Sequence, residues 1–114
     1  MATEAIKRGD VWWVSLDPSI GGEIRKTRPA VIVSNNPANT ALNRVVVVPI
    51  TSQTARLYPG EAIVTIDGRL GKAMADQIAA ASKQRLRSRI AALSPEDLKS
   101  VEEAILVHLA IHRL

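Results

Sequence analysis

The stretch RVVVVPITS, residues 44–52, is the strongest strand signal in the chain. Its apolar residues run almost without a break instead of alternating, which predicts a strand that is buried on both faces. Pro49 cannot donate a backbone hydrogen bond, so it indicates an edge or a bulge at that point of the strand. Two hydroxyl residues, Thr51 and Ser52, close the stretch.

Shorter strand-like runs lie on both sides of this stretch. They are VWWVSLD (11–17), AVIVS (30–34), EAIVTI (61–66) and a last short strand SRIAAL (88–93). The alanines of residues 71–81 favour a helix by propensity. However, these residues follow a turn at Asp67–Gly68 in a β-rich neighbourhood, which makes a strand pair the better interpretation. We expect residues 18–28 to form a charged loop and residues 35–43 a turn-rich connection.

The first strand and the last helix add two local expectations. Side chains alternate along a strand, so Trp12 is expected in the core while Trp13 faces a second surface. Near the C-terminus, Ser94 is expected to be the N-cap of a helix, and Pro95 follows it at the first helical position. Leu98 and Val101 begin an apolar face at helical spacing.

Several short strands followed by one amphipathic helix predict a mainly β fold with α: a small, strongly bent β-barrel with the C-terminal helix packed against it. The length of 114 residues suits a single domain spanning 1–114 with one core. A barrel of this size leaves apolar surface uncovered, which makes a dimer plausible.

Composition limits the function classes. The chain has 15 Lys and Arg against 11 Asp and Glu, a net charge of +4 that suits an anionic partner such as nucleic acid. With no cysteine, disulfides, thiolate metal sites and cysteine nucleophiles are excluded. No apolar run has the ~20 residues that span a bilayer, and the first ten residues lack the apolar segment of a signal peptide. We therefore expect a soluble, cytoplasmic protein without a membrane partner.

The segment GGEIRKTRP (21–29) concentrates charge beside a proline. Arg28 precedes Pro29, so its backbone is pushed towards the extended region, and its guanidinium can fork two hydrogen bonds onto a phosphate or carboxylate. Glu23, on the same loop, would place an acid–base group beside it. The alternative is a solvated surface loop with a local ion pair.

Further polar candidates follow. The hydroxyls of Thr51 and Ser52 are suited to donate to an anion at a sheet rim, or simply to satisfy nearby backbone. Asp76 and Gln77 interrupt an alanine-rich segment, and a buried Asp76 would need a partner such as Arg28 or Lys72. A structural anchor is an equally good interpretation of that pair.

Two patterns carry less weight. KQRLRSR (83–89) has four basic residues and no acid, which fits a track for a nucleic-acid backbone or a solvated turn; no aromatic residue is interleaved. His108 and His112 have the spacing of paired metal ligands, but the Glu of the H-E-x-x-H motif and a third His are missing. We expect no metal site and no cofactor.

The motifs KRGDVWWVSLDP, GGEIRKTRPAVIVSN, VVVVPITS, ADQI, KQRL and LSPEDLKSVEEAI occur in this order. Together they resemble the MazF/PemK (Kid) family of toxin–antitoxin ribonucleases over nearly the whole chain, from Lys7 to Leu114. The resemblance implies an SH3-like barrel that forms a homodimer and cleaves single-stranded RNA without a metal ion. It implies products with 2′,3′-cyclic phosphate and 5′-hydroxyl ends, inhibition of translation, and an antitoxin whose acidic, flexible tail covers the RNA groove. DNA binding together with that antitoxin would follow.

The resemblance also assigns roles to residues. Arg28 would stabilise the phosphorane and donate a proton, Thr51 would hold the scissile phosphate, and Glu23 or Asp76 would be the base. The residues expected to bind RNA are Arg25, Lys26, Ser52, Arg56, Gln77, Lys83 and Arg85.

Two departures from the family pattern are Met74 and Ala79, which stand where family members often carry basic residues. Both positions bear on RNA affinity and on sequence preference. Two other functions remain open: a non-catalytic gyrase poison like the CcdB proteins that share the fold, and a catalytically dead RNA-binding module.

Overall fold

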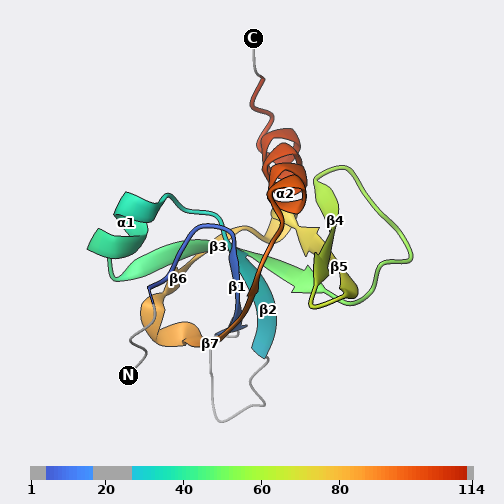
Figure 1. The fold of residues 1–114 in the computed structure, drawn as a ribbon. Coiled ribbons are helices and arrows are strands. Elements are labelled where there is room, and N and C mark those ends of the chain that lie inside the picture. Colours follow the sequence, from blue (N-terminus) through green and yellow to red (C-terminus); the bar gives the residue numbers. More distant parts are fainter. Residues whose placement is uncertain (1–4, 17–26, 113–114) are drawn as a thin grey trace, which may run out of the picture.

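The computed structural model describes residues 5–16 and 27–112. They form seven strands, two α-helices and two 3-10 turns, with the longer helix at the C-terminal end (Figure 1). The elements are β1 (Asp10–Ser15), β2 (Thr27–Ile32), α1 (Asn36–Ala41), β3 (Arg44–Thr51), β4 (Glu61–Ile66), β5 (Arg69–Met74), η1 (Ala75–Gln77), β6 (Ala79–Ser82), η2 (Lys83–Arg85), β7 (Leu86–Ala92) and α2 (Pro95–His108).

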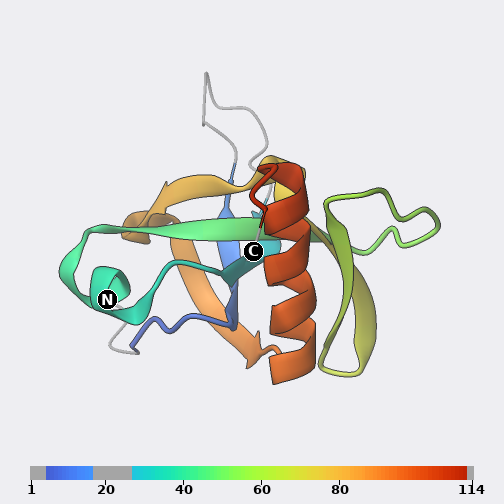
Figure 2. The same cartoon turned by 90° about the horizontal axis from the view of Figure 1, so that it is seen from above.

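The strands form one antiparallel sheet in the order β4-β5-β3-β2-β1-β7, and β6 pairs separately with β3. The sheet curls into a half-barrel, and the β4–β5 hairpin projects from one end of β3 (Figure 1). Seen from above, α2 stands between this hairpin and the rest of the sheet (Figure 2). The expected small, bent β-barrel with a C-terminal helix packed against it is confirmed.

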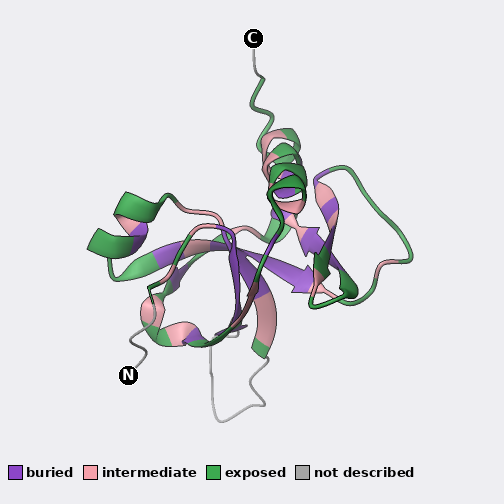
Figure 3. Cartoon of the chain, viewed as in Figure 1, coloured by how far each residue is buried: buried purple, intermediate pink, exposed green. Residues whose placement is uncertain are grey.

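Strand β3 is buried on both faces, as its sequence predicts. Val45 and Val47 belong to an apolar cluster around Trp12, whereas Val48 and Ile50 belong to a second cluster beneath α2. Figure 3 shows the buried residues concentrated in β1 and along β3. The expectation of a single core is therefore corrected: the curled sheet separates two apolar clusters, because its central strands have no solvent face.

Pro49 lies where β3 changes its partner. On one side, β3 pairs with β6 through Arg44–Val47 and then with β5 through Ile50 and Thr51. On the other side, Pro49 faces Ala30 of β2 without a break. On the first side, the β3–β6 ladder has ended before Pro49 and the β3–β5 ladder begins after it, so the missing N–H of Pro49 costs no hydrogen bond there. The predicted edge is therefore a short unpaired stretch on one side of an otherwise central strand.

Strand β2 begins three residues earlier than the sequence indicates. Thr27 and Arg28 pair with Ser15 and Val14 of β1, so Arg28 belongs to a strand and not to the charged loop. The extended backbone that Pro29 imposes on its predecessor is the physical reason. The remaining loop residues up to 26 lie outside the described residues.

The connection 35–43 holds a short helix, α1, where we expected only turns. Asn35 is its N-cap and accepts a hydrogen bond from the Ala38 amide at 2.8 Å. Asn39 is buried and anchors the helix by donating to the Ser34 carbonyl at 2.9 Å. The Asn–Asn–Pro sequence is therefore a helix start, because Asn is a good cap and proline is tolerated in the first turn.

Other local expectations are confirmed. Trp12 is 1% exposed and Trp13 is 41% exposed, as strand alternation requires. Of residues 71–81, residues 71–74 lie in β5 and residues 79–81 in β6 as expected, whereas Ala75–Gln77 form the 3-10 turn η1 between them. Asp67 and Gly68 both have positive φ (49° and 77°), the geometry of a type I′ hairpin turn.

Helix α2 begins and ends with recognisable caps. The Ser94 hydroxyl accepts from the Asp97 amide at 3.1 Å, as its N-cap role predicts. The helix ends at His108, and Ala110 adopts φ 56° while the Ile111 amide donates to the Leu106 carbonyl, a Schellman motif. His112 lies beyond this end, so it does not share a helical face with His108.

None of the helices within the described ranges has the length and apolar character of a membrane-spanning segment.

Candidate active site

A cleft of about 870 Å³ opens between the β4–β5 hairpin and the curled part of the sheet. Strands from both sides contribute to it, so no single sequence segment defines it. Its lining residues are Trp13, Thr27, Arg28, Pro29, Ile50, Thr51, Ser52, Ile66, Asp67, Arg69, Leu70, Gly71 and Ile90.

Arg28 and Thr51 are brought together by strand register. The ladder between β2 and β3 ends with the pair Ala30 and Pro49, two residues from Arg28 on β2 and two residues from Thr51 on β3. Both residues line the cleft, and both are half-buried. The guanidinium and hydroxyl predicted from separate motifs therefore belong to one cleft, with Ser52 beside them.

Among the residues that the structure describes, no hydrogen bond or ion pair engages the Arg28 guanidinium. The backbone is fixed by Pro29 and by pairing with Val14. Apolar surface from Trp13 and Ile50 adjoins it in the cleft, which strengthens any charge interaction made there by excluding water. This is a suitable site for a phosphate.

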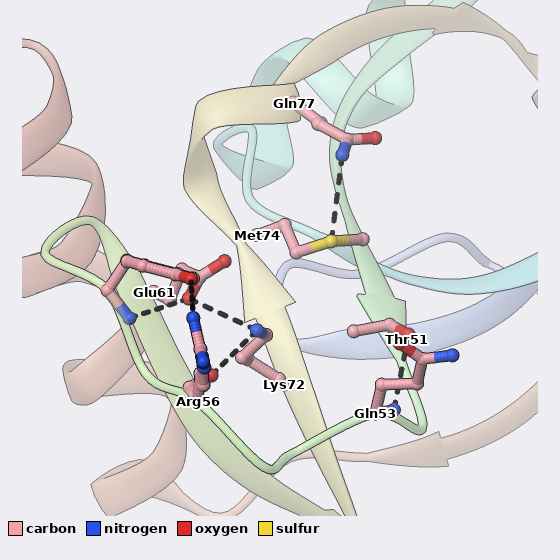
Figure 4. Close-up of polar contacts among 8 residues, drawn as sticks. Thr51, Gln53, Arg56, Glu61, Lys72, Met74 and Gln77 are labelled. Carbon is pink, nitrogen blue, oxygen red and sulfur yellow. Dashed lines mark hydrogen bonds and ion pairs between the residues drawn. The ribbon is translucent and has the colours of Figure 1, made fainter.

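Thr51 is oriented by the chain that follows it. Its hydroxyl oxygen accepts a hydrogen bond from the Gln53 amide at 3.2 Å (Figure 4). The hydroxyl proton is then left to donate to another acceptor, since a hydroxyl has one donor and two acceptor positions. Thr51 can therefore hold an anionic oxygen while its own orientation is maintained.

Asp76 and Gln77 are placed differently from Arg28 and Thr51. Both lie on η1, are exposed, and are not among the residues that line the cleft. The Gln77 side-chain amide contacts the Met74 sulfur at 3.6 Å. A partner such as Arg28 or Lys72 was expected only for a buried Asp76, and the Lys72 ammonium lies 3.2 Å from Glu61. An exposed Asp76 has water to solvate it and needs no such partner.

The expected RNA-binding residues are spread over several elements. Arg25 and Lys26 lie outside the described residues, as does Glu23, the candidate base. Arg56 is exposed on the loop 52–60, whose first residue, Ser52, lines the cleft. Lys83 and Arg85 are on η2, and the Arg85 guanidinium donates to the Ser15 carbonyl at 3.1 Å. Of the described candidates, the cleft gathers Arg28, Thr51 and Ser52.

Sequence reasoning missed two charged residues of the cleft, Asp67 and Arg69. They flank Gly68 in the hairpin turn, which was recognised as a turn but not as a wall of a site. A signal was present, since Asp67 is a residue of the two-residue turn and Arg69 follows it directly, and such a turn presents both charges at a hairpin tip. Arg69 adds a second cation to the cleft, and Asp67 adds a carboxylate.

Gly71 forms part of the cleft wall because the strands approach closely there. A Cβ atom built on it would lie 2.7 Å from the Ile50 Cγ2 atom, a distance that requires a shift of the packing. Within residues 5–16 and 27–112, no cluster of three or more His, Cys, Asp or Glu side chains has a metal-binding arrangement.

Comparison with known proteins places this cleft in context. A family model described as a PemK-like, MazF-like toxin of type II toxin–antitoxin systems matches residues 7–109. The endoribonuclease MazF9 of Mycobacterium tuberculosis is 38% identical over 113 residues, covering 91% of this chain and 96% of that protein. The endoribonuclease toxin MazF of Escherichia coli is 34% identical over 98 residues, covering 85% and 87%.

The solved structures agree with the sequence relatives. An endoribonuclease from a mycobacterial species, solved in complex with its cognate antitoxin, superposes with a TM-score of 0.78 at 26% identity. The superposition covers 95% of this chain and 98% of that one. The likeness therefore extends over the half-barrel, the hairpin and the C-terminal helix together.

Proposed function

The chain belongs to the PemK/MazF family of toxins of type II toxin–antitoxin systems, and from this premise we propose that it is an endoribonuclease toxin acting on single-stranded RNA. The observation that carries the proposal is the shared cleft of Arg28 and Thr51, which supplies a fixed cation and a hydroxyl donor for one phosphate. The named endoribonucleases that it resembles support the same activity.

The proposed reaction is a transesterification that needs no metal ion. The 2′-hydroxyl of the RNA attacks the adjacent phosphorus, and the bond from phosphorus to the 5′-oxygen breaks. The products are a 2′,3′-cyclic phosphate and a 5′-hydroxyl end. A base takes the 2′-proton, and the leaving 5′-oxygen receives a proton.

Each candidate residue has a role in that reaction. Arg28 neutralises the charge that develops on the phosphorane and donates the proton to the leaving oxygen, while Thr51 donates a hydrogen bond to the phosphate. The base is Glu23 or Asp76. Gln77 contacts a base of the RNA, and the cationic set Arg25, Lys26, Arg56, Lys83 and Arg85, together with Ser52, binds its backbone.

We further propose the biological setting that family membership implies. The toxin would be a single domain over 1–114, act in the cytoplasm and inhibit translation and growth. Its cognate antitoxin would lay an acidic, flexible tail over the RNA groove, and the pair would bind DNA. The related mycobacterial structure with its cognate antitoxin supports such a partner.

A homodimer is part of the same proposal. Three large apolar side chains at the C-terminal end of α2 and just beyond it are at least about half exposed: Val107 (58%), Leu109 (49%) and Ile111 (51%). Exposed apolar residues gathered in one place are typical of a protein–protein contact. Sedimentation of the purified protein should give twice the mass of one chain.

End-group mapping on a long, defined RNA tests the function. Purified protein in excess EDTA should cut at one short sequence and leave cyclic phosphate and 5′-hydroxyl ends. Arg28→Ala protein, purified in the same way, controls for contaminating nucleases and should not cut. Gyrase-dependent DNA breaks would instead indicate a gyrase poison, and RNA binding without cleavage would indicate a catalytically dead module. Either result would overturn the proposal.

A further inference from the structure

Lys72 is a charged residue with only 8% of its surface exposed. We propose that it is a positioning residue for RNA cleavage: its ammonium holds the loop of residues 52–60 in place beside the cleft. The inference rests on the proposed function, because the loop is assigned a place on the RNA-binding side of the molecule.

The backbone of Lys72 adjoins the candidate active site. In strand β5 it pairs with Thr51 of β3 on one side and with Ile63 of β4 on the other. The loop 52–60 starts directly after Thr51 and returns to β4, so Lys72 lies between the two ends of that loop. Its immediate neighbour Gly71 lines the cleft.

The ammonium is engaged by the loop and by the residue that follows it. It donates to the Arg56 carbonyl at 2.8 Å and lies 3.2 Å from the Glu61 carboxylate (Figure 4). The Tyr58 ring centroid is 5.7 Å from it. The Glu61 and Lys72 side chains are 11% and 10% exposed. A buried ammonium must keep such partners, because water cannot replace them.

A second contact fixes the same loop through the same carboxylate. The Tyr58 amide donates to the Glu61 carboxylate at 2.7 Å. Arg56 and Tyr58 are therefore both held by backbone atoms while their side chains remain exposed, with the Arg56 guanidinium 3.5 Å from the Tyr58 hydroxyl. A cation next to an aromatic ring suits a nucleotide, because the guanidinium binds phosphate and the ring stacks on a base.

The other ion pairs in the described residues have a different purpose. Arg8 pairs with Glu102 of α2 at 2.6 Å, and Arg89 of β7 pairs with Asp10 of β1 at 3.3 Å, so these pairs join elements of the scaffold. None of these four residues belongs to the loop 52–60 or to the residues that line the cleft. The Lys72–Glu61 pair is the one that fixes an irregular segment adjoining Thr51.

Cleavage kinetics test the inference. Lys72→Met should raise the KM for an RNA substrate about tenfold or more while kcat stays within about threefold. The reason is that a loosened loop weakens binding but leaves Arg28 and Thr51 in place. The matched control is Lys99→Met, which removes the same charge from an exposed position on α2 and should leave both constants unchanged.

Two further variants separate positioning from a general loss of structure. Lys72→Met alone leaves the buried Glu61 carboxylate without its ion-pair partner. The double variant Lys72→Met/Glu61→Gln removes both charges and keeps an acceptor for the Tyr58 amide. If Lys72 acts through Arg56, then Arg56→Ala should add little to KM in this background, although it raises KM in the wild type. A full additive effect of Arg56→Ala would overturn the inference.

The loop itself can be observed directly. The chain has a single tyrosine, so ring-labelled Tyr gives one NMR signal that reports on Tyr58. The signal should shift and sharpen in the Lys72 variants and stay unchanged in Lys99→Met. An unchanged signal, or a shifted signal with an unchanged KM in the folded double variant, would contradict the inference.

The inference and the proposed function can fail separately. If the wild type does not cut RNA, the proposed activity is wrong. The Lys72 variants are then compared by binding to an oligonucleotide that carries a 2′-deoxy sugar at each position. A tenfold weaker Kd for Lys72→Met/Glu61→Gln would support the loop role, and equal affinities would overturn it.

Discussion

Arg28 shows how neighbours in sequence and in space combine at one residue. Pro29 restricts its backbone to the extended region, and pairing with Val14 of β1 fixes it in strand β2. The backbone that carries its guanidinium is consequently held rigidly at the cleft. A preorganised cation is most effective in stabilising charge that develops during a reaction, since little has to move.

At Arg28 we expect a large loss of activity and little loss of stability. Arg28→Ala should reduce RNA cleavage by about 100-fold or more, because the developing phosphorane charge loses its cation. The cleavage rate of Arg28→Lys should lie between the rates of Arg28→Ala and the wild type, since a lysine keeps the charge but lacks the paired N–H donors of a guanidinium. Cleavage rates and thermal unfolding of the three proteins would check this. Near-normal cleavage by Arg28→Ala would contradict the assignment.

Thr51 gives a test of a single hydroxyl. Thr51→Val keeps the shape of the side chain and removes the donor, so cleavage should fall roughly 10- to 100-fold, the equivalent of a hydrogen bond to a charged group of about 1.5–3 kcal/mol. Thr51→Ser keeps the hydroxyl and should retain most of the activity. Single-turnover rates measure the difference. Equal rates for the Val and Ser variants would exclude a role for the hydroxyl.

At the scale of elements, helix α2 connects the local sequence to the second apolar cluster. Val101 and Ala104 are buried in that cluster, and the Asp97 carboxylate accepts from the Thr65 amide of β4 at 2.8 Å. The first turn of the helix therefore fixes both its own start and its contact with the β4–β5 hairpin. That hairpin in turn forms one wall of the cleft.

Removing the helix cap should destabilise the whole fold measurably. Ser94→Ala removes the acceptor for the Asp97 amide and should lower the free energy of unfolding by about 1 kcal/mol. Ser100→Ala is the matched control: its hydroxyl donates to the Glu96 carbonyl within the helix, and alanine is the better helix former there. Urea unfolding compares the two variants. An equal effect of both would show that the cap contributes nothing specific.

Strand β5 offers a prediction about the shape of the cleft. Gly71→Ala should lower the free energy of unfolding by about 1–3 kcal/mol, since the added Cβ would lie 2.7 Å from Ile50. Displacement of Ile50 alters the cleft wall next to Thr51, so RNA cleavage should fall as well. Chemical unfolding and cleavage rates measure the two effects. Full activity in a destabilised Gly71→Ala protein would show that this wall does not shape the site.

At the scale of the whole molecule, the net charge of +4 favours a polyanionic substrate. The logarithm of the association constant for RNA should fall linearly with the logarithm of the salt concentration. Arg56→Ala should reduce the salt slope by about 1 if that residue contacts a phosphate. Binding titrations at several salt concentrations measure the slope. An identical slope for the variant would indicate that Arg56 does not contact the RNA backbone.

The fold was predictable to the extent that it depends on local patterns. The continuous apolar run of residues 44–52, the Asp67–Gly68 turn and the Ser94 cap each determine their own conformation. The small helix α1 was missed because proline and asparagine favour turns as well as helix starts, and the buried contact of Asn39 decides between them. The start of β2 at Thr27 was missed because strand pairing with β1 extends it.

The sequence by itself determined the strands, the C-terminal helix, the basic charge and the candidates Arg28 and Thr51, since each depends on residues close together in the chain. Tertiary structure alone decided that β3 separates two apolar clusters, that Asp67 and Arg69 join the cleft, and that Lys72 pairs with Glu61 and not with Asp76. The physical reason is strand register. Which side chains meet across a sheet depends on how distant strands align, and no local pattern in the chain specifies that alignment.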